Sequence, residues 1–150
     1  ELIMEDCEVG EDAILPGVEG LKGPLSCLTQ ARFGICFGAV GAMLACYDEA
    51  LQYAKTRVQF DKPIAGYQIQ QQRLVEMLTE ITKAQLLCVQ LGRLKDAGTM
   101  KHTQVSLAKR NNVAMALEVA RTARTILGAA GITELCLAGP ACSEKQHRNR

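Results

Sequence analysis

The longest apolar pattern in the chain runs from Leu25 to Thr56, and no proline interrupts it. Apolar side chains recur there at steps of three and four, the spacing of one face of an α-helix. One stripe consists of Leu28, Ala31, Ile35, Ala39, Ala42, Cys46, Ala50 and Tyr53, and a second of Phe33, Phe37, Val40, Leu44 and Leu51. Two stripes predict a helix that is enclosed on two sides.

Two further helices are expected after the first. The second carries a repeat of seven formed by Leu74, Ile81 and Cys88, with Met77, Ala84 and Leu91 between them, and such a seam packs helices nearly parallel. Gly98 stands where a helix C-terminus favours glycine. Thr99 or Thr103 can cap the third helix. Its apolar positions, up to Leu127, are Val105, Ala108, Met115 or Ala116, Val119, Ala123 and Ile126.

These helices predict an all-α, up-down bundle, because short connections make successive helices antiparallel. Three long helices are clear, and the fourth is missing or degenerate. The three would then expose an apolar groove that needs a cover. We expect a lead-in over residues 1–23, with the strand-like start "ELIMEDCEV" and a loop rich in glycine and proline, then the bundle over residues 24–132. Residues 133–150 are expected to be a divergent, disordered tail.

Composition argues against a nucleic-acid surface. The 150 residues are 48% hydrophobic and 22% charged, with a net charge of +1. The basic residues Lys109, Arg110, Arg121 and Arg124 are spread along the third predicted helix, and aromatic residues make up only 4% of the chain. A surface that binds nucleic acids would need concentrated positive charge and aromatic rings for stacking. A solvated helix face is therefore the better interpretation.

The cysteines indicate buried free thiols and not a disulfide framework. There are seven, an odd number, and no two have the C-x-x-C spacing: Cys7, Cys27, Cys36, Cys46, Cys88, Cys136 and Cys142. Most fall at apolar positions inside helical runs, as expected in a reducing compartment. The two histidines, His102 and His147, have no other ligand nearby in sequence, so we expect no metal site.

The uncharged run "FGICFGAVGAMLACY", residues 33–47, raises the question of a membrane helix. It has 15 residues, whereas a bilayer crossing needs about 20, so it predicts a buried core helix with close helix contacts at its glycines. We expect no membrane span. The chain opens at Glu1 without an initiator Met or a presequence, which suggests a fragment or a processed product.

The corner between the first two helices, "RVQFDKPIAGYQ", contains more charged, amide and aromatic residues than a turn requires. Pro63 and Gly66 suffice to end one helix and begin the next. Arg57 could simply complement the carbonyl end of the first helix. Arg57 and Gln59 could equally bind a ligand.

Six segments together resemble the C-terminal helical domain of the acyl-CoA dehydrogenases, most closely the glutaryl-CoA dehydrogenase branch. They are "ARFGICFGAVGA" at 31–42, "RVQFDKPIAGYQ" at 57–68, "EMLTEITKA" at 76–84, "QLGRLKDAG" at 90–98, "SLAKRNNVAMALEVARTAR" at 106–124 and "ILGAAGI" at 126–132. The opening "ELIMEDCEVGEDAILPG" is similar to the last strand of that family's middle β-domain. The resemblance covers residues 1–133.

The resemblance implies that the corner binds FAD. Arg57 would contact the pyrophosphate of an FAD bound mainly by a neighbouring subunit, and Gln59 and Gln68 belong to the same motif. A guanidinium suits this role because its planar donors match phosphate oxygens. Phe60 is expected to be a packing residue. Asp61 stands where the family usually has glycine, and its carboxylate would weaken a phosphate site.

A second cofactor element is implied at Thr125, Ile126, Leu127, Gly128 and Ala129. The family segment has two adjacent glycines followed by Asn and Gly, which let the backbone approach the cofactor. Here Ala129 and Ala130 replace the second Gly and the Asn, while Gly128 and Gly131 remain. An alanine-rich helix end with a glycine cap would explain the same residues.

A third element is implied to line the acyl-CoA pocket and comprises Gln30, Ala31, Arg32, Phe33, Gly34, Ile35, Cys36 and Phe37. Arg32 is the one charged residue between Leu28 and Tyr47. A cation in so apolar a stretch needs a partner, either oxygens of CoA or an internal carboxylate.

The activity implied is oxidation and decarboxylation of glutaryl-CoA to crotonyl-CoA. Other dehydrogenase subunits (a homotetramer in the family) and electron-transferring flavoprotein would be partners, in the mitochondrial matrix. The catalytic base of this branch lies on a Tyr-Glu-Gly-Thr segment that the 150 residues do not contain, and Glu118, Glu134 and Glu144 are not in that motif. We therefore expect no catalytic residue and no activity of this chain alone. The alternative is a non-catalytic helical module for oligomerisation or interaction.

Overall fold

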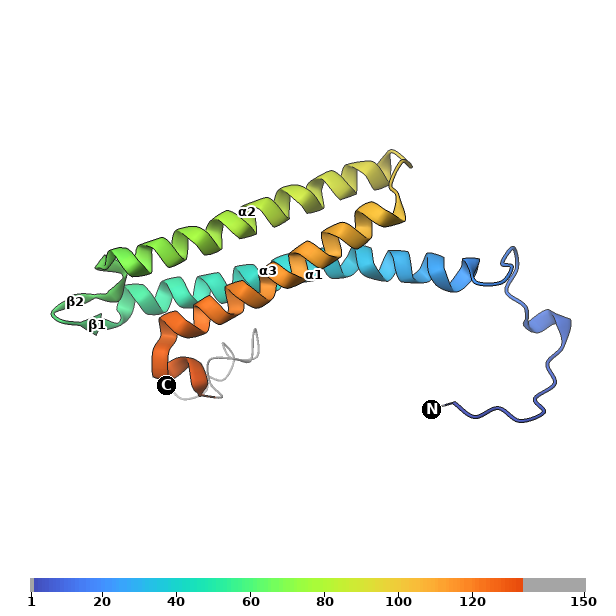
Figure 1. Ribbon diagram of the computed structural model, residues 1–150, viewed down its shortest axis with the longest axis horizontal. Helices are drawn as coiled ribbons and strands as arrows, with labels where there is room; N and C mark the ends of the chain where they lie inside the picture. Colours follow the sequence, from blue (N-terminus) through green and yellow to red (C-terminus); the bar gives the residue numbers. More distant parts are fainter. Residues whose placement is uncertain (1, 134–150) are drawn as a thin grey trace, which may run out of the picture.

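The structure is a computed structural model that describes residues 2–133, and three long helices dominate it (Figure 1). They are α1 (Lys22–Thr56), α2 (Gln68–Asp96) and α3 (His102–Leu127). The shorter elements are η1 (Glu11–Ala13), η2 (Ile64–Gly66) and η3 (Gly128–Ile132), together with a hairpin of β1 (Val58–Gln59) and β2 (Lys62–Pro63). The predicted all-α class with three long helices is confirmed.

Helices α1 and α3 run in the same direction, and α2 runs antiparallel to both (Figure 1). The hairpin and η2 turn the chain between α1 and α2, and a short turn follows α2. The most extensive packing in the bundle is between α1 and α3. The C-terminal ends of α1 and α3 consequently lie at the same end of the bundle, next to the hairpin (Figure 1).

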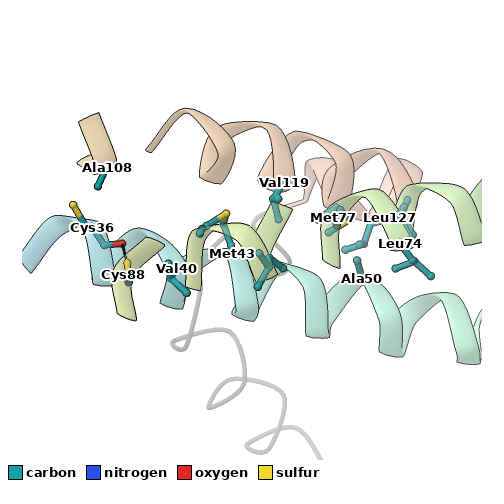
Figure 2. Close-up of a cluster of buried hydrophobic side chains, with 14 of the residues drawn as sticks. Cys36, Val40, Met43, Ala50, Leu74, Met77, Cys88, Ala108, Val119 and Leu127 are labelled. Atoms are coloured by element: carbon teal, nitrogen blue, oxygen red, sulfur yellow. Dashed lines mark hydrogen bonds between the residues drawn. The ribbon is translucent and has the colours of Figure 1, made fainter. Parts of the chain in front are cut away.

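The core of the bundle is apolar and is built by all three helices (Figure 2). The predicted seam of α2 is confirmed, since all six of its residues are buried: Leu74, Met77, Ile81, Ala84, Cys88 and Leu91. Helix α3 buries Val105, Ala108, Val119, Ala123 and Ile126, as its pattern predicted. The apolar stripes of both helices lie on the side that packs, although α2 also carries exposed apolar residues on its outer face.

The orientation of α1 differs from the prediction. Its buried residues, Cys36, Val40, Met43, Ala50 and Ala54, form a line that runs between the two predicted stripes. The outer parts of both stripes are exposed, including Leu28 at 49%, Ile35 at 47% and Phe37 at 42%. The expectation that α1 is enclosed on two sides is wrong for the described residues, because α2 and α3 cover one side of it only.

The helix ends follow from local chemistry. Pro24 lies in the first turn of α1, where a missing N–H costs no helical hydrogen bond, so α1 begins before the predicted Leu25. Gly98 has a φ of 67° and ends α2 as predicted. Its N–H bonds to the Lys95 oxygen at 3.0 Å and the Thr99 N–H to the Leu94 oxygen at 2.9 Å, the pattern of a Schellman motif.

The start of α3 differs from both predicted caps. Lys101 is the N-cap residue, and its N–H bonds to the side-chain oxygen of Gln104 at 2.8 Å. Thr99 instead closes the end of α2, so neither Thr99 nor Thr103 caps α3.

No strand forms in the lead-in between residues 2 and 21. The strand expected from "ELIMEDCEV" has no partner strand in this part of the chain, and a strand forms only where neighbouring backbone groups accept its hydrogen bonds. The large apolar residues of this segment, Leu2, Ile3, Met4 and Val9, are exposed. The tail expected beyond residue 133 lies outside the described residues.

Helix α1 is the one helix in the described part of the chain that is long and apolar enough to cross a membrane. Its most apolar window of 18 residues is only 17% buried. A helix of a soluble protein can pass the same test when other protein covers its apolar surface. The absence of a membrane span therefore stays a prediction.

Candidate functional site

Arg57 is the residue at which α1 ends and the chain turns into the hairpin. Its N–H bonds to the Tyr53 oxygen at 2.8 Å, and its oxygen accepts the Ile64 N–H at 2.9 Å. The side chain is exposed. Neither of the two ion pairs within residues 2–133 involves it, because these join Lys83 to Glu80 and Arg121 to Glu118. The backbone of Arg57 is thus fixed, while its guanidinium has no carboxylate partner in the described part of the chain.

The hairpin places Gln59 opposite Lys62 and Val58 opposite Pro63. Phe60 and Asp61 form its two-residue loop with φ values of 52° and 64°. Positive φ at both loop residues is the pattern of a type I′ turn, which matches the twist of a hairpin. Phe60, expected to be a packing residue, is 88% exposed and touches no core of this chain.

Tyr67 connects the hairpin to the start of α2. Its hydroxyl donates a hydrogen bond to the Gln59 oxygen at 2.9 Å, and the Lys62 ammonium lies 4.1 Å from the centre of its ring. Gln71 donates to the Ala65 oxygen at 3.0 Å and so holds η2 on the same helix. Gln68, the first residue of α2, is exposed next to this connection.

The second predicted cofactor element lies at the same end of the bundle, at the junction of α3 and η3 (Figure 1). Ile126 and Leu127 are buried in the core, so their side chains hold the helix in place. Thr125 and Ala129 are exposed, and the Thr125 hydroxyl donates to the Arg121 oxygen at 2.9 Å. A ligand here would meet exposed backbone and small side chains.

The two glycines of this element are required by the chain itself. Gly128 has a φ of 59°, a conformation that residues with a Cβ rarely adopt. A Cβ on Gly131 would lie 2.5 Å from the backbone oxygen of Arg124. The helix-end interpretation therefore accounts for both glycines, whether or not a cofactor binds.

The predicted substrate segment lies in the N-terminal half of α1. Helix α1 has 35 residues and is about 50 Å long. Arg32 belongs to its first third, whereas Arg57 directly follows its last residue. The structure therefore places the two cofactor elements at the same end of the bundle and keeps the substrate segment far from them.

Arg32 is partly buried and donates a hydrogen bond to the Ser106 hydroxyl of α3 at 3.2 Å. No carboxylate within residues 2–133 forms an ion pair with it, so an internal carboxylate does not explain this cation. The Lys95 ammonium lies 4.1 Å from the centre of the Phe33 ring, which in turn packs against Phe37. Arg32 and Lys95 together make this end of the bundle cationic.

The remaining residues of the segment divide by exposure. Gln30, Ala31, Gly34, Ile35 and Phe37 are exposed and available to a ligand. Cys36 is fully buried, and its thiol donates to the Arg32 oxygen at 3.1 Å. The Cys36 side chain thus serves the contact between helices in this structure.

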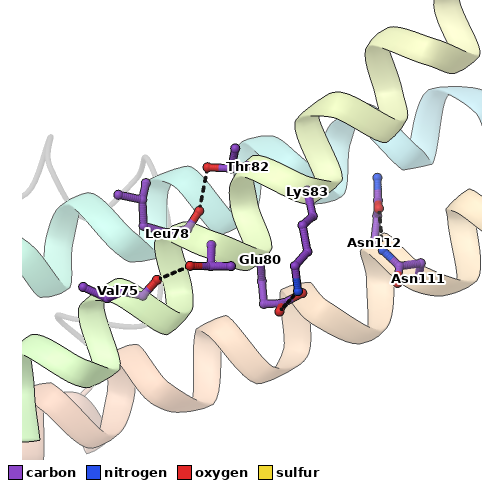
Figure 3. A network of polar contacts seen from close by, with 8 residues as sticks. Val75, Leu78, Glu80, Thr82, Lys83, Asn111 and Asn112 are labelled. Carbon is purple, nitrogen blue, oxygen red and sulfur yellow. Dashed lines mark hydrogen bonds and ion pairs between the residues drawn. The ribbon is translucent and has the colours of Figure 1, made fainter.

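Asn112 is a buried polar residue that the apolar pattern of α3 did not predict. Its amide nitrogen lies 3.3 Å from the Cys36 oxygen and 3.2 Å from the Cys88 sulfur. The Cys88 thiol donates to the Cys36 oxygen at 3.5 Å (Figure 2). Asn111 donates to the Asn112 side-chain oxygen at 3.1 Å (Figure 3). The sequence signal that could have predicted its burial is its place four positions after the apolar Ala108, on the same face of the helix.

The cysteines of the described residues are free thiols in different surroundings. Cys36 and Cys88 are buried and Cys46 is half-buried, whereas Cys7 and Cys27 are exposed, which corrects the expectation for those two. Burial raises the pKa of Cys36, Cys46 and Cys88, and the neighbouring Cys88 raises that of Cys36 further. Such thiols are poor nucleophiles. Cys136 and Cys142 lie outside the described residues.

Comparison with known proteins identifies a family. The sequence model of the family described as "Acyl-CoA dehydrogenase, C-terminal domain" matches residues 19–145, and so continues past residue 133, where the resemblance of the motifs ended. Glutaryl-CoA dehydrogenase from Mycobacterium smegmatis is similar in structure, with 57% identity, a TM-score of 0.77 and coverage of 79% of this chain and 31% of that one. A second structure of a glutaryl-CoA dehydrogenase from this organism, in complex with FADH2, is 45% identical, with a TM-score of 0.78 and coverage of 85% and 34%.

Among curated proteins, the mitochondrial short-chain specific acyl-CoA dehydrogenase of Homo sapiens is 33% identical over 137 residues. The match takes in 89% of this chain and 33% of the human protein. The chain thus spans about a third of the length of the curated relatives that it matches.

Proposed function

Because this chain belongs to the acyl-CoA dehydrogenase family, whose members are FAD-dependent oxidoreductases, we propose that it is the C-terminal helical domain of a glutaryl-CoA dehydrogenase-like enzyme. The similarity to glutaryl-CoA dehydrogenases supports this branch. The proposed reaction of the whole enzyme is oxidation and decarboxylation of glutaryl-CoA to crotonyl-CoA.

The residues at the corner fit FAD. Arg57 is exposed, has a fixed backbone and pairs with no carboxylate in the described part of the chain. A guanidinium in this state can donate two parallel hydrogen bonds to a diphosphate. Gln59 and Gln68 flank it and offer amide groups that can bind polar atoms of the dinucleotide. This free guanidinium is the observation that carries the proposal.

The second element would contribute close backbone contact. Thr125 and Ala129 are exposed beside Gly128, at the same end of the bundle as Arg57. The side chains of Ile126 and Leu127 are in the core, so these two residues contribute by holding the segment in place. FAD is an elongated molecule, so one FAD that lies along this end of the bundle would contact both the Arg57 corner and the Gly128 segment.

The distance between the cofactor elements and the substrate segment supports an assembly of subunits. Arg32 and Arg57 are 25 residues apart along α1, about 37 Å at the rise of an α-helix, so one compact active site does not use both from the same chain. We infer that the Arg57 corner reaches the FAD of a neighbouring subunit. The segment Gln30–Phe37 then lines a different acyl-CoA site, as expected in a homotetramer.

Arg32 fits a role in binding acyl-CoA. Its one hydrogen bond to a side chain goes to the neutral Ser106 hydroxyl, which leaves the positive charge without a counterion in the described residues. Carbonyl or phosphate oxygens of a CoA thioester would satisfy the remaining donors. The exposed members of the segment would surround the acyl or pantetheine chain.

These 150 residues supply binding groups but no catalytic base. When bound, FAD would accept the hydride that leaves the β-carbon of the thioester. A carboxylate must remove the α-proton, and the Tyr-Glu-Gly-Thr segment that would carry it is not in the sequence. Glu118 is exposed and pairs with Arg121 at 2.8 Å on the surface of α3. Glu134 and Glu144 lie outside the described residues.

Flavin absorption tests this proposal. The purified chain is mixed with FAD, and the visible spectrum is recorded before and after glutaryl-CoA is added. We expect the flavin band to shift on binding and then to stay oxidised, because no base removes the α-proton. Bleaching by glutaryl-CoA would contradict the absence of a base. An Arg57→Ala chain that binds FAD as tightly as the wild type would contradict the cofactor site.

A non-catalytic interaction module is the second candidate, and the outer face of α2 favours it. Val75, Leu78, Leu86 and Val89 recur on this face and are exposed by 45–65%. The hydroxyls of Thr79 and Thr82 on the same helix donate to the Val75 and Leu78 oxygens at 2.8 Å, so they leave the face apolar (Figure 3). An apolar surface of this kind is typical of a helix that packs against another subunit. Co-purification with a full-length dehydrogenase, without flavin-dependent change, would favour this candidate.

The partner and location that we propose follow from the family alone. Electron-transferring flavoprotein would accept the electrons of the whole enzyme. Some relatives are mitochondrial, and a mitochondrial matrix location is the corresponding proposal for this chain.

A further inference from the structure

The hairpin that carries Gln59 has little core packing to hold it. All residues from Arg57 to Pro63 are exposed, and each of its strands has only two residues. Two such strands alone are at best marginally stable in water. Something outside the hairpin must therefore fix the direction in which its side chains point.

Tyr67 provides that connection from the N-cap position of the next helix. Its hydroxyl bonds to the Gln59 oxygen at 2.9 Å, its N–H bonds to the Ile64 oxygen at 3.1 Å, and its own oxygen accepts the Gln71 N–H at 3.1 Å. These contacts join β1, η2 and α2. A displacement of the Tyr67 ring would therefore move β1, which carries Gln59 and directly follows Arg57.

Lys62 lies on the same face of the hairpin as the two proposed FAD ligands. It is the cross-strand partner of Gln59, and side chains of directly opposite residues share one face of a pair of strands. Alternation along the strand puts Arg57, two positions before Gln59, on that face as well. The Lys62 ammonium is held 4.1 Å from the Tyr67 ring centre and has no ion pair within residues 2–133.

The start of α2 adds to the positive potential of this face. Tyr67 is the N-cap of α2, and its side chain makes no cap hydrogen bond to the first amide groups of the helix. The N-terminal end of a helix carries partial positive charge. The two cations thus share one face of the hairpin, and α2 begins directly after it.

We propose that Lys62 is a second cation of the diphosphate site and that Tyr67 is the positioning residue that aims both Lys62 and the Arg57–Gln59 strand. This inference rests on the proposed FAD site and assigns roles to two residues of the corner that the resemblance did not name as ligands. Lys62 would act as a point charge beside the bidentate Arg57, and it would offset the carboxylate of Asp61. Tyr67 would touch the protein only.

The test uses the 150-residue chain and FAD, with binding followed by flavin fluorescence anisotropy at two salt concentrations. The variants are Lys62→Met, Lys62→Arg, Tyr67→Phe and Arg57→Met, and Lys55→Met is the control because Lys55 is an exposed lysine close by in the last turn of α1. We expect Lys62→Met to weaken binding about tenfold and to flatten its salt dependence, as loss of one phosphate contact should. Lys62→Arg should restore most of the affinity, and Lys55→Met should change it by less than about twofold.

Tyr67→Phe keeps the ring beneath Lys62 and removes only the bond to Gln59. We expect a loss of roughly threefold in FAD affinity, about what one neutral hydrogen bond contributes. Deuterium uptake by the backbone of residues 57–66 should rise in this variant without FAD present. Unchanged uptake together with unchanged affinity would show that Tyr67 does not position the strand.

The outcomes separate this inference from the proposed function. If Arg57→Met abolishes binding while Lys62→Met binds like the wild type, the inference is wrong and the FAD site stands. An equal loss of FAD affinity in Lys62→Met and Lys55→Met would also overturn it, since both lysines would then act only by general electrostatic attraction of FAD. If the wild-type chain does not bind FAD, or if Arg57→Met binds equally well, the proposed site fails and this inference fails with it.

Discussion

The side-chain amide of Asn112 donates a hydrogen bond to the backbone oxygen of Cys36, and the two nitrogen and oxygen atoms are 3.3 Å apart in the interior of the bundle. Both residues are fully buried. The same amide group reaches the Cys88 sulfur at 3.2 Å, so one side chain of α3 bonds to α1 and to α2. A buried amide of this kind is stable only while its partners are in place, which makes it specific for one alignment of the three helices.

Replacement of Asn112 by alanine should destabilise the bundle. The change removes the bonds to Cys36 and Cys88 and leaves a cavity, so we expect the free energy of unfolding to fall by about 1–3 kcal/mol. Urea unfolding followed by circular dichroism measures this. Arg110→Ala is the control, because Arg110 is an exposed residue of the same helix outside this network; it should cost no more than about 0.5 kcal/mol. Equal losses in the two variants would contradict the role of Asn112.

The buried thiols should make the stability fall at alkaline pH. Burial raises the pKa of Cys36 and Cys88 in the folded chain, while an unfolded thiol keeps a pKa of about 8.5. The unfolded state therefore loses its thiol protons first. Their contribution to stability is complete below the unfolded pKa and decreases as the pH rises above it, through the raised folded values.

This dependence can be measured by urea unfolding between neutral pH and pH of about 9.5. Other groups also titrate in this range, so the Cys88→Ala chain serves as the reference. Its unfolding free energy should decrease less steeply with pH than that of the wild type. Parallel curves would show that the Cys88 thiol does not contribute.

The hairpin loop should become more stable when its first residue accepts positive φ more readily. Phe60 has a φ of 52° and is 88% exposed, so its replacement removes no core packing. Asparagine is preferred at this position of a type I′ turn. We expect Phe60→Asn to raise the free energy of unfolding by about 0.5–1 kcal/mol, whereas Phe60→Ala, which tolerates positive φ poorly, should bring no gain. Thermal unfolding of the two variants provides the comparison.

Two glycines should respond to alanine in opposite directions. In Gly131→Ala the new Cβ would lie 2.5 Å from the Arg124 oxygen, so the junction of α3 and η3 must shift, and we expect a loss of about 1–3 kcal/mol. Gly92 lies inside α2 with no atom within 4 Å of an added Cβ. Gly92→Ala should therefore gain up to about 1 kcal/mol from helix propensity. Melting temperatures of both chains test the pair, and a gain in Gly131→Ala would contradict the close approach.

A charge on the outer face of α2 should reduce self-association. Leu86 is 65% exposed in the centre of that face, between Leu78 and Val89. If the face packs against another copy, Leu86→Glu would place an unpaired carboxylate in the contact and lower the average mass in sedimentation experiments. Gln90→Glu adds the same charge to an exposed position on α2 beside the face and should leave the mass unchanged. An equal effect of the two changes would point to net charge and not to this contact.

The spans of the helices could be predicted because their signals are local. The repeat of seven in α2 predicted six buried residues, and Gly98 predicted the end of that helix through its positive φ. Both depend on residues close together in the chain. The caps of α3 were missed for a related reason: Thr99 was needed to close α2, and Lys101 took its place at the next helix start.

The candidate site was only partly predictable. The resemblance of the corner motif named Arg57, Gln59 and Gln68, whose roles stay a proposal. Lys62 and Tyr67 were not named, because their contact depends on the register of a hairpin with strands of two residues. Such a register is decided by loop geometry and has no periodic signal in the sequence.

By itself, the sequence determined three long helices, the packing face of α2 and the packing face of α3, because a repeat of seven marks one side of α2 and apolar residues recur at helical spacing along one side of α3. Only the tertiary structure decided how α1 is turned. Apolar residues surround α1 on almost every side, so periodicity cannot choose a face, and contact with α2 and α3 buried the line of Cys36, Met43 and Ala50. The burial of Asn112 was decided in the same way, because partners on two other helices replace the water that its amide gives up.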